Sequence, residues 1–368
     1  EVVAAYRTLG NSLDGIEVGN EYDNVTTLTA AEMWSVVKQY KAAIDAALPR
    51  AHLKVIGPSA NTATTNTRLD DFVTATLADG DGAAAATMAE LSSHLYPGSH
   101  CGTSNTSIAS LLSASKYAQD QQKMDGIMAI GARLPRRVPM TIDESNSASC
   151  SGQPGVSDAY AMSLWSLDYL LQTAKAGLAR LQFHTNTAAV CGDFQARTSP
   201  DYPISYRYYG AFCARSQAAL DRNQLAATPL YYGLLAFAQV PAGRFLSLTV
   251  PADDLGLTRA YAVSGPGGQV TLVLVNLADP ATAGAAQSVT VHLPGRYASA
   301  SAVTLASSDP AGLASLDSSA VALGGAHVSP SGRLTRKPAA ASVDVSGSDV
   351  RVAVAPGTAR IVTVLPRH

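Results

Sequence analysis

Residues 15–57 read GIEVGNEYDNVTTLTAAEMWSVVKQYKAAIDAALPRAHLKVIG, and this stretch decides the fold class. It opens with a short apolar run, Gly15–Asn20, and closes with another that ends at Gly57. Between them, Thr29–Leu48 has apolar residues at helical spacing, with Thr29 in the N-cap position and Glu32 three residues on. The pattern predicts a helix between two strands, and a strand–helix–strand unit of this length is typical of a parallel sheet.

The same alternation continues to residue 184. A second helical pattern covers Ser157–Lys175, and the first ten residues have the pattern of the middle of a helix. Short runs of apolar and β-branched residues, each followed by a polar or Gly/Pro/Ser turn, predict strands at Gly15–Asn20, Leu53–Gly57, Leu91–Tyr96, Val138–Asp143 and Leu178–His184. Repeated units of this kind predict a parallel sheet wrapped by helices.

The pattern changes near residue 245. Short alternating runs replace the helices and are separated by Pro, Gly, Asp and Ser; they cover Leu246–Val250, Val270–Asn276, Val289–Leu293, Ser301–Leu305, Val350–Val354 and Arg360–Leu365. This predicts a catalytic domain over residues 1–244 and an all-β module, a sandwich, over residues 245–368.

Composition excludes two classes of function. The chain has 26 Lys and Arg against 28 Asp and Glu, so its net charge of −2 is too small to gather nucleic acid. The longest apolar stretches, such as 230–240, are shorter than the roughly 20 residues of a membrane span. We therefore expect a globular protein that binds neither nucleic acid nor a membrane.

The four cysteines, Cys101, Cys150, Cys191 and Cys213, form no CxxC pair and have no metal-type histidine spacing. An even number at separated positions fits two disulfides and hence a secreted or extracytoplasmic protein; four buried thiols are the alternative. The chain does not start with a signal-peptide pattern, so export implies a leader that has been removed.

Two predicted strands end in glutamates. The first reads IEVGNE and ends at Glu21; the second reads MTIDESN and contains Glu144. Because the carboxyl ends of parallel strands meet at one edge, both carboxylates reach the same site, unless they are solvated loop residues. Glycoside hydrolysis needs such a pair: one protonates the leaving oxygen, and the other attacks the anomeric carbon or activates water. Tyr96 could hydrogen-bond the nucleophilic carboxylate, with His94 as a structural hydrogen-bonding residue.

Five stretches over roughly residues 10–245 read, in this order, IEVGNEYD, GPSA, SSHLYPG, IDESNSASCSGQPGVSDAYAMSLWSLDYL and TPLYYGLLAFAQ. They resemble the heparanase/β-glucuronidase family of retaining glycoside hydrolases, family seventy-nine. The resemblance implies a (β/α)8 TIM barrel with a C-terminal β-sandwich. It makes Glu21, after strand four, the acid/base and Glu144, after strand seven, the nucleophile. Asn20 then binds the sugar 2-hydroxyl, and Tyr96 or His94 lies beside Glu144. We expect the charge of Glu144 and partial desolvation to raise the pKa of Glu21.

The loop after the nucleophile departs from the family. The family's Tyr-Gly-Gly is replaced by Ser149-Cys150-Ser151-Gly152. A uronate could still be held by the backbone N–H groups and the serine hydroxyls of this stretch, from Ser149 to Gly152, or by Tyr202. Arg197 or Arg207 could pair with it as a bidentate partner. Glucuronate specificity stays open, whereas the retaining chemistry is little affected.

The resemblance also implies that this chain supplies barrel strands four to eight. Strands one to three then come from an earlier part of a longer polypeptide or from a second chain produced by proteolysis; a truncated, non-barrel architecture is the third possibility. In this frame we expect Cys101 to pair with Cys150 and Cys191 with Cys213, each disulfide stiffening a loop at the sugar cleft.

Together these features predict a secreted, retaining β-glycoside hydrolase. The expected activity is that of an exo-acting β-glucuronidase releasing a terminal uronic acid from a glycan or glycoconjugate. A β-glycosidase for another neutral or substituted sugar, and a non-catalytic carbohydrate-binding barrel relic, are the alternatives. No metal and no organic cofactor is expected, since two carboxyl groups suffice for the chemistry.

Overall fold

The structure is a computed structural model that describes residues 1–61, 67–185, 190–191, 208–248, 250 and 257–367, and the backbone alone at 197–199 and 202–204. The chain forms two compact units. The first comprises Glu1–Pro97, Tyr117–Asn146 and Gln172–His184, and the second comprises Gly98–Lys116, Ser147–Leu171 and Thr185–His368.

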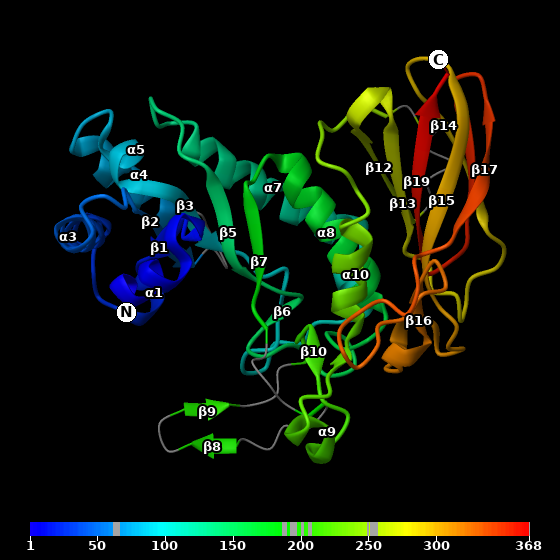
Figure 1. Ribbon diagram of the computed structural model, residues 1–368, viewed down its shortest axis with the longest axis horizontal. Coiled ribbons are helices and arrows are strands. Elements are labelled where there is room, and N and C mark those ends of the chain that lie inside the picture. Colours follow the sequence, from blue (N-terminus) through cyan, green and yellow to red (C-terminus); the bar gives the residue numbers. More distant parts are fainter. Residues whose placement is uncertain are drawn as a thin grey trace. The chain divides into compact units, whose positions relative to one another are not determined.

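A five-stranded parallel sheet forms the centre of the first unit, in the order β1-β2-β3-β5-β7 (Figure 1). Its strands are β1 (Gly15–Glu17), β2 (Lys54–Asn61), β3 (Met88–His94), β5 (Met140–Ser145) and β7 (Arg180–Phe183). Helices connect successive strands: α3 (Ala30–Ala47), α4 (Thr67–Ala78), α5 (Ala83–Thr87), α7 (Ala114–Gly131) and α8 (Ala161–Ala176). Two shorter helices are α1 (Val2–Leu9) and α2 (Tyr22–Val25). The predicted parallel sheet with helical crossovers is confirmed.

All five strands predicted in this part of the chain are present, with boundaries displaced by a few residues. The helix predicted from Thr29 is also confirmed. The Thr29 hydroxyl accepts a hydrogen bond from the Glu32 N–H at 3.3 Å, and the Glu32 carboxylate accepts one from the Thr29 N–H at 2.8 Å. This capping box satisfies two N–H groups that the first helical turn would otherwise leave unpaired.

Buried apolar side chains from strands and helices make the core of this unit. Val55, Leu91 and Ile142 are fully buried on the sheet, and Phe72 on α4 is fully buried as well. Trp34 on α3 meets Phe72 edge to face, with ring centroids 5.8 Å apart. The helices thereby cover one face of the sheet and fix the positions of the strand ends.

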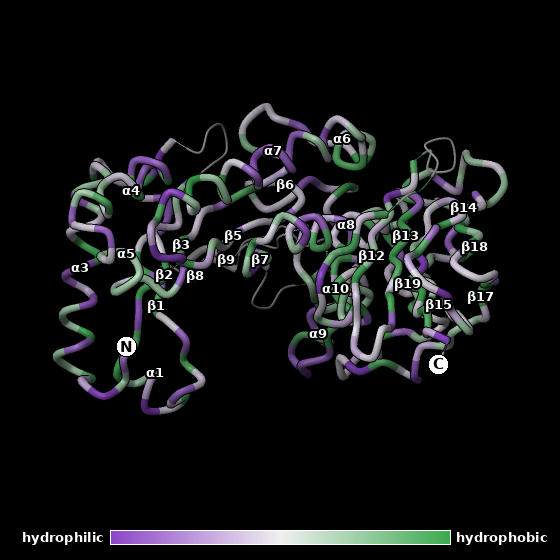
Figure 2. The backbone as a smooth tube through the Cα atoms, turned by 90° about the horizontal axis from the view of Figure 1, so that it is seen from above, coloured by the Kyte–Doolittle hydropathy of each residue, from purple (hydrophilic) through white to green (hydrophobic). Residues whose placement is uncertain are grey.

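Eight antiparallel strands form the main sheet of the second unit, in the order β12-β13-β19-β15-β17-β18-β14, with β16 beside β15. They are β12 (Thr258–Ser264), β13 (Val270–Asn276), β14 (Gln287–His292), β15 (Tyr297–Ser307), β16 (Val321–Leu323), β17 (Ala340–Ser346), β18 (Asp349–Val354) and β19 (Thr358–Pro366). Val, Leu and Ala residues of seven of these strands pack into one core. β13 is buried along its whole length, and Figure 2 shows it as hydrophobic.

The predicted strands after residue 245 are confirmed with one exception. The prediction for Leu246–Val250 is wrong in its described residues. Phe245 forms a bridge to Val263 and the Leu246 N–H donates to the Ala262 carbonyl at 2.9 Å, but no strand forms over residues 246–248. The sequence pattern did not predict β12, β16 or β17. β17 lacks buried alternation, since most of its residues are exposed.

The remaining elements of the second unit are short. Three pairs of strands are β4 (Gly98–Ser99) with β6 (Ala148–Ser149), β8 (Arg197–Ser199) with β9 (Tyr202–Ile204), and β10 (Phe212–Cys213) with β11 (Ala226–Ala227). The helices are α6 (Ile108–Leu112), α9 (Gln217–Asp221) and α10 (Pro229–Phe237). Within the described helices of both units, none has the length and apolar composition that crossing a bilayer requires.

Candidate active site

Glu21 lies just beyond the carboxyl end of β1, where the backbone makes an unusual turn. The residue has φ 44° and ψ 51°, the left-handed region that non-glycine residues seldom adopt. Its N–H donates to the carbonyl of Ser59 at 2.8 Å, and this carbonyl lies on the neighbouring strand. Backbone strain of this kind persists only where the surroundings hold it, and it is concentrated at functional sites.

Glu144 reaches the same edge from β5, through an irregularity in strand pairing. Ser93 pairs with Ile142, but His94 pairs with Glu144, so Asp143 is an extra residue in β5. Such a bulge changes which face the following side chains occupy. It allows both Asp143 and Glu144 to approach His94, with Nε2 of His94 3.8 Å from Asp143 Oδ1 and Nδ1 3.9 Å from Glu144 Oε1.

The two glutamates are close together. A carboxylate oxygen of Glu21, one of Glu144 and a ring nitrogen of His94 all lie within 4.8 Å of one another. The side chains of Glu21 and Glu144 keep 18% and 26% of their surface exposed, so a ligand can reach both. A separation near 5 Å between two carboxyl groups is the spacing at which one can attack an anomeric carbon while the other protonates the leaving oxygen.

Glu144 is held in its ionised form. Burial alone would raise the pKa of Glu144, but hydrogen bonds from His184 and Tyr96 and the nearby imidazoles lower it to about 2. The Tyr96 hydroxyl donates to Oε1 at 2.7 Å, and Nδ1 of His184 lies 3.3 Å from the same oxygen. A carboxylate that receives such hydrogen bonds is charged and fixed in orientation at any ordinary pH.

Glu21 is held by different partners. Nδ1 of His94 lies 2.9 Å from Oε1, and the Asn24 amide donates to Oε2 at 2.8 Å. The hydrogen bond with His94, the largest influence, lowers the pKa of Glu21 together with the hydrogen bond from Asn24 and the charge of His94, although burial and the charge of Glu144 raise it. The expectation that the pKa of Glu21 is raised is therefore wrong for the free site, because the sequence did not reveal the imidazole in contact with this carboxylate.

A second layer of polar groups lies behind His94. Asp143 is fully buried in its side chain, and its Oδ2 accepts a hydrogen bond from the Ser59 hydroxyl at 2.5 Å. The same hydroxyl lies 3.2 Å from Oε1 of Glu17 on β1. Burial and the charge of Asp143 raise the pKa of Glu17. The pair of glutamates therefore sits above a chain of hydrogen-bonded, titratable groups.

The other predicted site residues are distributed as follows. Asn20 is exposed beside Glu21. Ser149 and Gly152 belong to the second unit, as does the loop around them, so their predicted roles stay predictions. The side chains of Arg197 and Tyr202, on β8 and β9, and all of Arg207 lie outside the described residues.

Both expected disulfides are present in the second unit. Cys101 is bonded to Cys150, and Cys191 to Cys213. Ser149 Oγ lies 3.3 Å from the sulfur of Cys101. Gly152 has φ 82°, and a Cβ at this position would come within 3.0 Å of Ser157 and Tyr209, so this turn requires glycine.

Sequence reasoning missed four residues of the site: Ser59, Asn24, Asp143 and His184. Two of them were visible as signals. Asp143 directly precedes Glu144, and His184 ends a predicted strand in the same way that Glu21 ends another. The positions of Ser59 and Asn24 depend on local backbone geometry, namely a φ of 52° at Ser59 and the short helix after Glu21. No sequence pattern predicted either feature.

Three groups of the site, Glu21, His94 and Glu144, are of types that also bind metal ions. Their contacts are accounted for without one. Glu21 and His94 are in direct hydrogen-bond contact at 2.9 Å, and Tyr96 holds the Glu144 oxygen that lies nearest to His94. We assign these contacts to hydrogen bonds.

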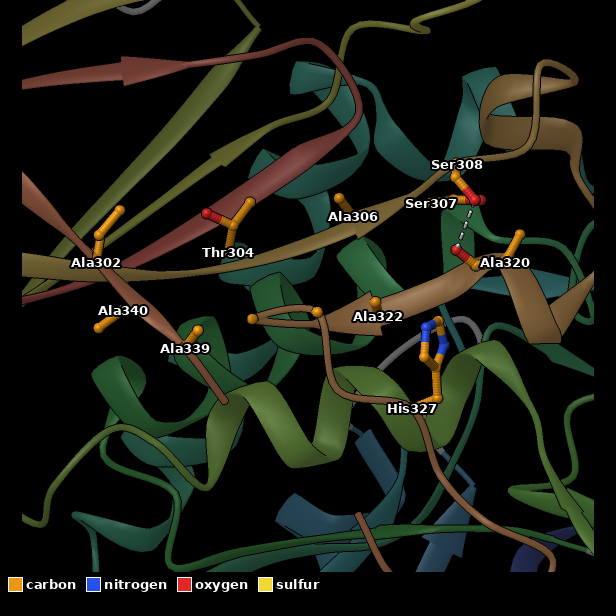
Figure 3. A pocket seen from close by; sticks show the side chains of 13 residues that line it. Ala302, Thr304, Ala306, Ser307, Ser308, Ala320, Ala322, His327, Ala339 and Ala340 are labelled. Carbon is orange, nitrogen blue, oxygen red and sulfur yellow. Dashed lines mark hydrogen bonds between the residues drawn. The ribbon is translucent and has the colours of Figure 1, made fainter. Parts of the chain in front are cut away.

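A second candidate for a binding site is a groove of about 490 Å³ in the antiparallel sheet (Figure 3). Figure 3 shows that its walls are small side chains, among them Ala302, Thr304, Ala322 and Ala340, with His327 at one end. No carboxylate and no aromatic platform other than this imidazole belongs to its lining. The groove therefore lacks the paired carboxylates that lie at the edge of the parallel sheet.

Solved glycoside hydrolases share the fold of this chain. The structure of a 4-O-α-L-rhamnosyl-β-D-glucuronidase from Fusarium oxysporum 12S, in complex with Rha-GlcA, matches 99% of this chain and 73% of its own chain, with a TM-score of 0.71 at 22% identity. A family 51 arabinofuranosidase from Xanthomonas axonopodis pv. citri matches 95% of this chain and 65% of its own, with a TM-score of 0.60 at 14% identity.

Among curated proteins, a β-glucuronidase from Neurospora crassa is 24% identical over an alignment of 163 residues that covers 41% of this chain. The matched part spans about a quarter of that relative's length, 25%. No family model matches the chain. These similarities agree with the resemblance to the heparanase/β-glucuronidase family and establish the fold.

Proposed function

We propose that this protein is a retaining β-glycoside hydrolase in which Glu144 is the nucleophile and Glu21 the acid/base. The observation that carries the proposal is the approach of the two carboxylates, within 4.8 Å, at the carboxyl end of a parallel sheet. The depressed pKa of Glu144, about 2, supports its role as the group that is always ionised.

The chemistry follows from this geometry. The Glu144 carboxylate attacks the anomeric carbon and forms a glycosyl ester, while Glu21 gives a proton to the departing oxygen. Glu21, now ionised, removes a proton from the water that hydrolyses the ester. Tyr96, at 2.7 Å from Glu144, orients the carboxylate for attack. Asn20 is proposed to bind the sugar 2-hydroxyl, where the contact tightens as positive charge develops on the ring.

The substrate that we propose is a β-glucuronide, cleaved from its non-reducing end. Two relatives support it, since one is named a β-glucuronidase and another a rhamnosyl-β-glucuronidase. Ser149, Gly152 and Tyr202 are the proposed contacts to the uronate. A 4-O-substituted β-glucuronide is the second candidate, because the Fusarium relative is named for such a substrate.

The architecture is part of the proposal. The five parallel strands would be strands four to eight of a (β/α)8 barrel, because among the described residues β1 and β7 each have one unpaired edge. Three further strands, from another part of the polypeptide or from a second chain, would close it. We further propose that residues 1–244 form this catalytic domain and that the antiparallel sheet of residues 245–368 folds over into a sandwich. The two disulfides support export.

The test uses p-nitrophenyl β-glucuronide, its 4-O-rhamnosyl derivative, a β-xyloside and an α-arabinofuranoside as substrates. Glu144→Gln and Glu21→Gln should each lower the turnover of the preferred substrate by roughly 10³-fold or more. Glu32→Gln is the matched control, because glutamine also completes the capping box on α3. An unchanged rate in Glu144→Gln contradicts the proposal. Binding of glycans without turnover in wild type and variants alike would instead indicate a carbohydrate-binding protein.

A further inference from the structure

His94 is held between carboxylates at both ring nitrogens. Its side chain is only 3% exposed. Nδ1 lies 2.9 Å from Oε1 of Glu21, and Nε2 lies 3.8 Å from Oδ1 of Asp143. Among the described residues, this Asp143 oxygen is buried and has no hydrogen-bond partner. The imidazole of His94, 3.8 Å away, is therefore placed to offset the negative charge of Asp143.

The titratable groups around His94 are predominantly acidic. Four carboxyl groups face it: Glu17 from β1, Glu21 from the start of α2, and Asp143 and Glu144 from β5. The phenol of Tyr96 and the imidazole of His184 contact Oε1 of Glu144. Close carboxylates favour the imidazolium form. Burial alone would lower the pKa of His94, but the hydrogen bond to Glu21 and the charges of Asp143, Glu144 and Glu21 raise it.

Ser59 ties Asp143 to the acid/base. Its hydroxyl donates to Oδ2 of Asp143 at 2.5 Å, and its carbonyl accepts the N–H of Glu21 at 2.8 Å. Asp143 and Glu21 are thus fixed to one buried residue, on opposite sides of the imidazole. This arrangement leaves a difficulty for the acid/base, because a general acid has to carry a proton and the contact with His94 favours the ionised form of Glu21.

We infer that His94 and Asp143 are positioning residues that store, on the imidazole, the proton that Glu21 delivers to the leaving oxygen. The inference deepens the function proposed above and rests on it. Asp143 stabilises the charged imidazole, and the 2.9 Å contact between Nδ1 and Glu21 is the path of the proton. The two residues act through Glu21, and neither contacts the sugar or the departing oxygen.

The proton balance closes over the two half-reactions. At rest the imidazolium donates its Nδ1–H to the Glu21 carboxylate. As the glycosidic bond breaks, this proton passes through Glu21 to the departing oxygen, and Glu144 forms the ester bond to the anomeric carbon. His94 is left neutral, with its remaining proton on Nε2 facing Asp143. In the second half-reaction Glu21 takes a proton from water, the ester is cleaved, and the proton returns to Nδ1.

The experiment combines kinetics with a titration of the free protein. The pH dependence of kcat/KM is measured for wild type, Asp143→Asn and His94→Gln, on aryl β-glycosides with a poor and a good leaving group. ¹⁵N-histidine NMR follows the protonation of His94. In Asp143→Asn we expect the basic limb of the profile to move to lower pH, together with the His94 titration. In His94→Gln the poor leaving group should lose roughly 10²-fold in rate and the good one much less.

The outcomes separate this inference from the proposed function. A basic limb and a His94 titration that both stay in place in a folded Asp143→Asn protein overturn the inference, even where Glu21→Gln and Glu144→Gln abolish turnover. If Asp143→Asn does not fold, the titration of His94 in the wild-type protein decides. A pKa of His94 at or below the ordinary histidine value overturns the inference. Full activity of Glu21→Gln and Glu144→Gln overturns the proposed function, while the His94–Asp143 coupling stays measurable in the free protein.

Discussion

The hydroxyl of Tyr96 donates a hydrogen bond to Oε1 of Glu144 at 2.7 Å. Tyr96 follows β3 by two residues, and Glu144 lies near the end of the adjacent β5. The contact therefore joins two neighbouring strand ends at the point where the sheet presents its polar edge. Nδ1 of His184, beyond β7, lies 3.1 Å from the same hydroxyl, so three consecutive strands contribute to the setting of one carboxylate.

Replacing Tyr96 by phenylalanine should raise the pKa of Glu144 and slow the enzyme. Glu144 has a pKa depressed to about 2, so activity is lost only when the pH falls through that value. Without the tyrosine hydrogen bond the pKa rises, and the acid limb of kcat/KM moves to higher pH. A hydrogen bond to a charged group contributes about 1.5–3 kcal/mol, which corresponds to a loss of about 10- to 100-fold in rate.

The measurement for Tyr96→Phe is the pH profile of kcat/KM on the preferred glycoside. Tyr40→Phe is the matched control, since Tyr40 is 53% exposed on α3, away from the two glutamates. An acid limb that stays in place in Tyr96→Phe would show that the hydroxyl does not set the ionisation of Glu144.

A second network stabilises the opposite, amino-terminal end of the parallel sheet. Nε of Arg180, on β7, lies 2.5 Å from Oε1 of Glu90 on β3, and the Thr141 hydroxyl on β5 donates to the other Glu90 oxygen at 2.8 Å. Arg180 also pairs with Asp14, just before β1. The arginine thus links the first and last strands of this sheet.

Arg180→Met should leave the Glu90 carboxylate buried beside Thr141 without its cation. Removing one partner of a buried pair is costly, but Arg180 is 45% exposed, so we expect a loss of about 1–3 kcal/mol in the free energy of unfolding. Urea denaturation measures it. The double variant Arg180→Met/Glu90→Gln should recover part of the loss, since it removes the buried charge. A double variant less stable than the single one would contradict this account.

Ser59 provides a test of backbone strain beside the site. Its φ of 52° is left-handed, and its hydroxyl serves Asp143. Ser59→Ala and Ser59→Gly both remove the hydroxyl, but only glycine adopts this φ without strain. We expect Ser59→Ala to be less stable than Ser59→Gly by about 1 kcal/mol in chemical denaturation. Equal stabilities would indicate that the backbone relaxes at this position.

The sequence predicted the scaffold well and the details of the site less well, for a physical reason. Strand and helix patterns depend on local periodicity, so β1, β2, β3, β5, β7 and the capped helix at Thr29 could be predicted directly. Period-2 alternation, however, would send Asp143 and Glu144 to opposite faces of β5. The bulge at Asp143 overrides this alternation, and a bulge is a property of the pairing with β3, which a single strand does not encode.

The same limit applies to the ionisation of the site. The charge of Glu144 near Glu21 could be expected once both glutamates were placed at one edge. The stronger influence, His94 at 2.9 Å, depends on where β3 ends relative to the turn at Glu21. In the second unit, β17 was missed because only Val343 and Val345 pack against the core, while its other residues are small or polar and exposed.

The two disulfides should contribute unequally to stability. Cys101 and Cys150 are separated by 49 residues, whereas Cys191 and Cys213 are separated by 22. In the chain-entropy description a cross-link restricts the unfolded chain more when the loop is longer, which gives about 4 kcal/mol for the first disulfide and about 0.7 kcal/mol less for the second. Denaturant unfolding of Cys101→Ser/Cys150→Ser and Cys191→Ser/Cys213→Ser, compared with wild type under non-reducing conditions, measures both losses. A larger loss from removing Cys191–Cys213 would mean that contacts in the folded protein, rather than the length of the loop, determine the contribution of these bonds.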